Sequence, residues 1–223
     1  MFKHMGWTRT IHLFLLALVV WANAACSETW ARKRAYFALR NVPTAVIVED
    51  PNERLFDPTL AYELAHTATY CLANEPDVEA QRLSNLIDPP RISDLRDRLG
   101  DQFDRTPIDQ LGRLIGAHQV VHVTIQKVSL QNDPGVFRPT GEVAVRVIDV
   151  EYGRIIFPGN QLEHVGAKPG YAVVGVLPYV TQIDEAPSAR RRLSQALAQR
   201  LGRNVARLFY DYLPRQAGEP FEH

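Results

Sequence analysis

The alternation of apolar and polar residues predicts several short β-strands after residue 42. A β-branched run from Ala45 to Val48 is typical of a buried strand. Within the stretch Gly116 to Val128, apolar residues alternate with polar ones, which predicts a strand with one polar face. Two further strands are expected at residues 141–150 and 154–162, joined by a tight turn at Gly153. The last three strands therefore form a predicted antiparallel meander.

Apolar residues that recur at three- and four-residue steps predict helices between and after these strands. The predicted helices cover Pro58 to about Ala73, Ile92 to Leu99, Pro107 to Ile115, and Ser188 to about Leu213. We expect Asp57 and Thr106 to cap the first and third of them, Leu114 to face inward, and Leu83 to Asp88 to form a weak strand. The predicted fold class is α/β: a mixed sheet with a C-terminal antiparallel meander, flanked by helices and completed by a long C-terminal amphipathic helix.

Two histidines, His118 and His122, stand four residues apart, a spacing at which a helix would present both to one metal ion. The surrounding sequence predicts a strand instead, in which the two side chains lie about 13 Å apart along one face. That separation is several times the span of two ligands on one zinc ion. We therefore predict no metal site and expect His122 to be half exposed on the polar side of its strand.

The composition argues against nucleic acid as a partner. The chain has 223 residues, of which 46% are hydrophobic and 22% charged, as in a globular protein that buries a sizeable core. It carries 25 basic and 25 acidic residues. It therefore lacks the basic excess with which proteins bind nucleic acids through counterion release.

The amino terminus has the layout of a secretory signal. Lys3 and Arg9 precede nine apolar residues, Leu13 to Trp21, far fewer than the ~20 that a membrane-spanning helix needs. Two outcomes are open: cleavage by the ordinary signal peptidase after Ala24, or cleavage before Cys26 followed by lipidation of its thiol. We favour lipidation of Cys26. We expect an exported, periplasmic protein that is anchored to a membrane, with the outer membrane favoured.

The second cysteine, Cys71, lies on the apolar stripe of the first predicted helix. This position indicates a buried, inert thiol. If Cys26 carries lipid, Cys71 has no partner for a disulfide within the chain. His66 projects from the opposite side of the same predicted helix, and we expect it to be solvated.

The segment from Gly166 to Val180 is longer and more apolar than an ordinary connection. One interpretation makes it an extra strand that packs on the domain. The other makes it an exposed patch that docks a partner or touches the membrane surface. The candidate contact residues of such a patch are Tyr171, Val174, Val176, Leu177 and Tyr179.

The sequence contains no recognisable motif for catalysis or cofactor binding. It has no GxSxG elbow, no HExxH zinc motif, no P-loop and no dinucleotide fingerprint. We predict no catalytic residue, no metal and no cofactor. The alternative is a periplasmic enzyme or small-molecule-binding protein with a shallow site at Glu49 and Asp50, at the end of the first predicted strand.

Five segments carry a family resemblance: VPTAVIVED, LIDPPRISDLRDRL, LGRLIGAHQVVHVTIQ, VAVRVIDVEYGRIIF and LAQRLGRNVARLFYDY. Together they resemble the superfamily that contains the TolB amino-terminal domain and the curli-secretion lipoprotein. The chain is most similar to uncharacterised bacterial envelope lipoproteins that end in a helix with a motif like Phe209-Tyr210-Asp211. The resemblance implies a protein that contacts other envelope proteins or copies of itself.

These patterns predict a signal peptide at residues 1–25, a tether at 26–41, a single α/β domain at 42–213 and a C-terminal tail at 214–223. We expect the domain to act as a non-catalytic protein-binding or assembly module, held at the membrane by lipid on Cys26.

Overall fold

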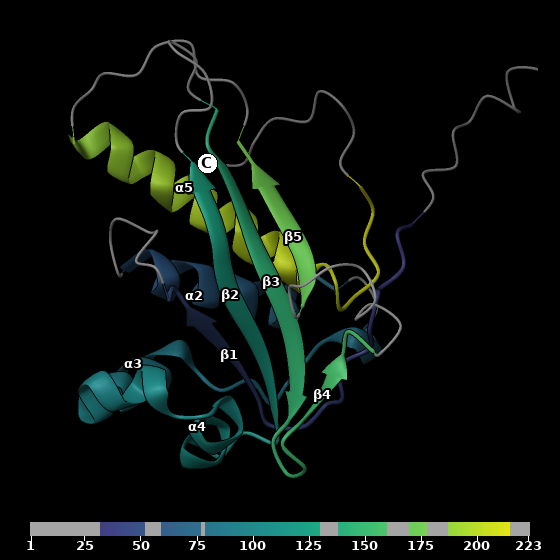
Figure 1. The fold of residues 1–223 in the computed structure, drawn as a ribbon. Helices are drawn as coiled ribbons and strands as arrows, with labels where there is room; N and C mark the ends of the chain where they lie inside the picture. Colours follow the sequence, from purple (N-terminus) through teal and green to yellow (C-terminus); the bar gives the residue numbers. More distant parts are fainter. Residues whose placement is uncertain are drawn as a thin grey trace, which may run out of the picture. The chain divides into compact units, whose positions relative to one another are not determined.

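A five-stranded mixed sheet runs through the protein in the computed structural model (Figure 1). The structure describes residues 32–51, 59–76, 79–129, 138–159, 170–177 and 187–214. Residues Arg34–Tyr212 form one compact unit, which contains the whole sheet. The end of the predicted tether belongs to this unit, because Phe37 packs against its core.

The sheet joins one parallel pair of strands to an antiparallel set. β1 (Thr44–Glu49) is parallel to β2 (Gln119–Ser129), and β3 (Thr140–Asp149) is antiparallel to β2. β4 (Arg154–Phe157) and β5 (Tyr171–Val176) both pair antiparallel with β3, β4 at its end and β5 along its first part. The predicted fold class and the meander β2–β3–β4 are confirmed.

Helices cover both faces of this sheet. On one face, α2 and α5 pack on the apolar side chains of the strands, including Val121 and Val145. On the other face, α3 and α4 pack on Ile47 and Val120. Within the described ranges, no helix is long and apolar enough to cross a membrane. The helices, with two short 3₁₀-helices, are α2 (Thr59–Asn74), η1 (Glu79–Gln81), α3 (Pro89–Leu99), η2 (Gly100–Arg105), α4 (Ile108–Ile115) and α5 (Pro187–Ala206).

The last helix is shorter than its apolar periodicity predicts. α5 ends at Ala206, and the chain then turns, although Leu208 and Phe209 remain buried. Phe209 packs edge-on against Phe157 of β4, with ring centroids 5.9 Å apart. These apolar residues are therefore buried by contacts with distant parts of the chain and not by continuation of the helix. The local spacing of apolar residues does not reveal such contacts.

The motif Phe209-Tyr210-Asp211 closes the unit through side-chain contacts. The Tyr210 hydroxyl donates to the Glu75 carboxylate at 2.7 Å, at the end of α2. The Asp211 carboxylate accepts a hydrogen bond from the backbone N–H of Ala35 at 2.8 Å. These contacts give the motif a structural role.

Two other predicted strands are absent or short. The segment Leu83 to Asp88 pairs with β1 only through an isolated bridge between Leu86 and Thr44. It then leads into Pro89 and Pro90, which lack the N–H that a strand ladder needs. β4 likewise ends at Phe157, directly before Pro158, and residues 160–162 of the predicted strand lie outside the described residues.

The start and the inner face of α4 also differ from the prediction. Pro107 occupies the N-cap position, and the Thr106 hydroxyl donates to the carbonyl oxygen of Gln102. Leu114 is exposed, because the buried face of this short helix is formed by Leu111, Gly112 and Ile115. Asp57, the predicted cap of α2, lies outside the described residues.

Cys71 is fully buried on α2, as predicted. Burial raises the pKa of its thiol to about 12, and the nearby Glu75 carboxylate contributes in the same direction. Since the thiolate is the reactive form, we expect iodoacetamide to leave Cys71 unmodified in the native protein at mildly alkaline pH.

Mass spectrometry of a Cys26→Ser variant measures this resistance, and the same protein in guanidinium chloride should be modified fully. A Ser84→Cys variant adds an exposed thiol as the matched control, because Ser84 is exposed. Rapid alkylation of native Cys71 would contradict the buried position.

Candidate functional site

A buried polar cluster lies on three neighbouring strands at the carboxyl end of β1. His122 of β2 stands beside Ile47 of β1 and Arg146 of β3 in the strand register. Its Nε2 atom lies 2.8 Å from Oε2 of Glu49, and its Nδ1 atom lies 3.0 Å from a terminal nitrogen of Arg146. The alternative interpretation of the sequence placed a site at Glu49 and Asp50, and the structure adds His122 as the partner of Glu49 and Arg146 as the partner of His122.

The hydrogen bonds assign the roles of the two ring nitrogens. An arginine can only donate, so Nδ1 of His122 accepts from Arg146. Nε2 then carries the proton and donates it to Glu49. Both ring nitrogens are therefore engaged by the protein itself, and the imidazole is not available to act as a general base on a substrate.

His122 and Arg146 also affect the pKa of the Glu49 carboxyl. Burial alone would raise its pKa, but the hydrogen bond from His122 and the positive charge of Arg146 and Arg96 outweigh burial and lower the pKa below its ordinary value. Glu49 is therefore a carboxylate at neutral pH. The hydrogen bond between Glu49 and His122 links the carboxyl end of β1 to β2.

His122 is more buried than the sequence indicates. Its exposed fraction is 1%, whereas a half-exposed side chain was expected. The difference arises because Glu49 and Arg146 flank the ring on the adjacent strands. His118 is exposed and precedes β2, so the two histidines do not act as a pair. Within the described ranges, no group of three or more His, Cys, Asp and Glu side chains is placed to hold a metal ion.

The predicted contact segment forms β5 in its central part, and strand geometry divides its residues between two faces. Val174 is 56% exposed and stands opposite Glu142 on the outer face. Tyr171 and Leu177 pack against the core on the other side. The predicted patch is therefore not one continuous surface, because successive side chains of a strand point to opposite faces. Tyr179 lies outside the described residues.

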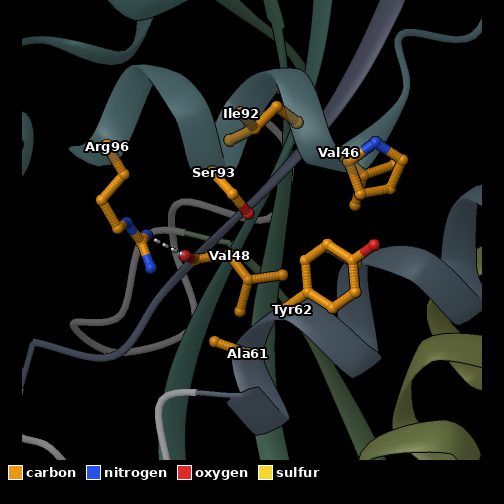
Figure 2. A pocket seen from close by; sticks show the side chains of 9 residues that line it. Val46, Val48, Ala61, Tyr62, Ile92, Ser93 and Arg96 are labelled. Carbon is orange, nitrogen blue, oxygen red and sulfur yellow. Dashed lines mark hydrogen bonds between the residues drawn. The ribbon is translucent and has the colours of Figure 1, made fainter. Parts of the chain in front are cut away.

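A small cavity lies at the outer edge of β1, between α2 and α3. Figure 2 shows Ala61 and Tyr62 of α2 on one side, Ile92 and Ser93 of α3 on the other, and Val48 of β1 between them. Its volume is about 40 Å³, room for little more than a water molecule.

Arg96 closes one end of this cavity. A terminal nitrogen of its guanidinium donates to the carbonyl oxygen of Val48 at 3.0 Å (Figure 2). The guanidinium carbon also lies 4.5 Å from the centroid of the Phe103 ring. Arg96 therefore fixes α3 to the end of β1.

A larger groove runs along the outer side of α2. Its volume is about 450 Å³, within the range of ligand-binding clefts. One wall carries Tyr62, His66 and Tyr70, which recur every four residues on one helix face. The other wall is the irregular chain from Leu83 to Pro90. His66 is exposed, as predicted, and it borders this groove.

The aromatic wall is accessible to a partner. Tyr62 is 38% exposed and Tyr70 is 58% exposed, and the Tyr62 and His66 rings lie nearly parallel with centroids 6.0 Å apart. Tyr62 and Pro89 also border the small cavity, so the two hollows share these two residues. The four-residue spacing of the aromatic residues is visible in the sequence, but the second wall that completes the groove is not.

The sheet and its helices define a mixed α/β protein whose polar cluster is internally paired and whose α2 groove carries an accessible aromatic wall. No family model matches the chain, and no curated protein matches it. Among the solved structures to which the chain is similar are three bacterial proteins, each with a TM-score below 0.5.

The lipoprotein GNA1162 from Neisseria meningitidis is 12% identical with a TM-score of 0.41, over 71% of this chain and 93% of its own. The PelC dodecamer from Paraburkholderia phytofirmans is 11% identical with a TM-score of 0.40, over 81% of this chain and 97% of its own. The hypothetical protein CT253 from Chlamydia trachomatis is 16% identical with a TM-score of 0.35, over 73% of this chain and 96% of its own. Membership of the TolB-like superfamily remains a prediction.

Proposed function

We propose that the protein is an exported, lipid-anchored envelope protein that acts as a protein-binding or assembly module and not as an enzyme. The observation that carries this proposal is the α2 groove, where Tyr62 and Tyr70 remain exposed opposite a second wall formed by residues 83–90. Exposed tyrosines in a concave surface are typical of protein-binding sites, because each ring offers a large apolar area with a polar tip. The groove is the proposed contact surface.

The amino-terminal sequence supports the location. The basic residues Lys3 and Arg9, the short apolar run and Cys26 give the order expected of an exported lipoprotein. Lipid on Cys26 would place the domain at a membrane, where its partners would be other envelope proteins or further copies of the chain. The resemblance to the TolB-like superfamily favours the same role.

The polar cluster argues against the catalytic alternative. Glu49 already accepts a hydrogen bond from His122, and both nitrogens of that ring are engaged. A Glu49→Ala and Asp50→Ala double variant tests this alternative directly. It should retain partner binding if the protein acts through its surface.

Cross-linking in intact cells, followed by mass spectrometry of the purified protein, tests the proposal. We expect an acylated amino-terminal Cys26 and a defined envelope protein, or a second copy, cross-linked to the wild type. Tyr70→Ala should lose that cross-link, since a central exposed aromatic residue commonly contributes more than 1 kcal/mol to binding.

Two controls accompany this experiment. Val174→Asp changes the exposed outer face of β5, and this variant should keep the cross-link. If Val174→Asp lost the cross-link while Tyr70→Ala kept it, the contact surface would lie on β5. Tyr152→Ala removes a tyrosine that is 65% exposed in the turn between β3 and β4. An unacylated chain beginning at Ala25, without any cross-linked protein, would contradict both the anchor and the assembly role.

A further inference from the structure

The α2 groove has two walls with different chemistry. Tyr62, His66 and Tyr70 form the aromatic wall. Pro89 and Pro90 stand at the end of the other wall, where they begin α3. Because four residues of a helix rise about 6 Å, the aromatic side chains follow one another at that interval along the groove. The 6.0 Å between the Tyr62 and His66 ring centroids agrees with this interval.

This chemistry excludes two common kinds of peptide ligand. An added β-strand needs a row of backbone donors and acceptors, but the backbone of α2 is bonded within its helix and the proline pair has no N–H. An added α-helix is about 10 Å wide, and it docks through an apolar stripe into a wide hydrophobic trough. The α2 groove instead presents the polar groups of Tyr62, His66 and Tyr70, spaced along its aromatic wall.

The groove fits a polyproline II segment. Such a segment has no internal hydrogen bonds, so its carbonyl groups remain free to accept from tyrosine hydroxyls and a histidine N–H. It rises about 3.1 Å per residue, so two residues span about 6.2 Å and match the interval of the aromatic wall. Aromatic-lined grooves bind proline-rich segments in this conformation.

The negative charge of Asp88, at the end of the groove near Pro89 and Pro90, favours polyproline II segments that carry a basic residue. Asp88 borders the groove and is exposed, and its side chain makes no capping hydrogen bond to α3 although it occupies the N-cap position. Among the described residues that line the groove, none is a lysine or an arginine. A basic residue in the ligand would therefore find an acidic partner at this end of the groove lining.

We infer that the α2 groove binds a proline-rich segment of a partner protein in the polyproline II conformation, with an arginine or lysine of that segment paired to Asp88. This inference rests on the proposed function and names the kind of partner. The tyrosine rings would stack on the proline rings, and Asp88 would fix the direction of the segment.

Titration of the full-length chain with the synthetic peptide PPRPPRPP tests the inference, with binding followed by tyrosine fluorescence and calorimetry. We expect saturable binding to the wild type. Tyr70→Ala should weaken it about tenfold, and Asp88→Asn should weaken it several-fold and reduce its salt dependence. Tyr152→Ala is the matched control and should bind like the wild type, because that tyrosine is equally exposed but lies between β3 and β4.

Further probes separate the outcomes. A peptide with both arginines replaced by glutamate should bind several-fold more weakly, and equal binding would overturn the role of Asp88. Saturable binding of an N-acetylglucosamine oligomer, with no binding of the peptide, would overturn the inference in favour of a glycan. If the peptide did not bind but the cellular cross-link depended on Tyr70, the inference of a proline-rich ligand would be overturned, and the proposed function would stand. If the peptide bound but the cellular cross-link persisted in Tyr70→Ala, only the proposed contact surface would be overturned.

Discussion

Replacing Gly202 with alanine is expected to lower the free energy of unfolding by about 3 kcal/mol. In an open helical position the same exchange raises stability by about 1 kcal/mol, because alanine is the better helix former. At Gly202 of α5, however, an added Cβ would lie 2.6 Å from the carbonyl oxygen of Leu64 and 3.1 Å from the backbone nitrogen of Ala68. These are backbone atoms of α2 and cannot turn aside. The two helices would have to separate.

Urea unfolding of the Gly202→Ala variant measures this loss. Gly159→Ala is a suitable control, since nothing lies within 4 Å of the added Cβ there, and its stability should change by less than about 0.5 kcal/mol. A Gly202→Ala protein as stable as the wild type would show that α2 and α5 pack less closely than described.

Replacing Glu75 with alanine is expected to cost about 3 kcal/mol at neutral pH. Its carboxylate accepts from the Tyr210 hydroxyl at 2.7 Å and from Nε of Arg203 at 2.8 Å. Tyr210 is 1% exposed. Without Glu75 its buried hydroxyl would lose the hydrogen-bond acceptor that offsets the cost of its desolvation. The substitution would also release the end of α5 from α2.

The same carboxylate is expected to make stability fall in acid. Burial alone would raise the pKa of Glu75, but the hydrogen bond from Tyr210 and the charge of Arg203 outweigh burial and lower it below the ordinary value of 4.5. Because the folded pKa is the lower one, the unfolded chain takes up the proton first as the pH falls. The stabilisation is therefore complete above the unfolded pKa and is lost as the pH drops through the folded pKa.

Urea unfolding between about pH 5 and pH 3 should show this loss in the wild type and a flatter dependence in Glu75→Gln. Glu79→Gln, a change at an exposed glutamate on η1, is the matched control and should keep the wild-type slope. An unchanged slope in Glu75→Gln would show that the network with Tyr210 and Arg203 does not tune this group.

The local pattern of apolar residues predicts those helices and strands whose buried side chains recur at a regular spacing along the sequence. The run from Ala45 to Val48 became β1, and the stripe through Leu64 and Cys71 became the buried side of α2. The end of α5 could not be predicted in this way. Leu208 continues the apolar periodicity, but the chain has left the helix there, and Tyr210 instead bonds to Glu75, which lies 135 residues away in sequence.

The candidate site was predictable only in part for the same reason. Glu49 stood out as an acid at the end of a strand, yet its partner His122 is 73 residues away, and no local spacing links the two. The aromatic wall of the groove follows from the four-residue spacing of Tyr62, His66 and Tyr70 along the sequence. Its second wall does not, since the residues around Leu86 have the composition of a strand but pair through one bridge alone.

The contact between Ala35 and Asp211 has a mechanical consequence for a protein held by its amino-terminal segment. Tension along that segment would enter the unit at the hydrogen bond from the Ala35 N–H to Asp211 and at those from the Tyr36 and Phe37 N–H groups to the Leu208 carbonyl. The force would meet the end of α5 and the Phe37 ring packed on Phe157 before it reached β1. A pull on the amino-terminal segment is therefore expected to break the hydrogen bonds of residues 35–37 before it reaches β1.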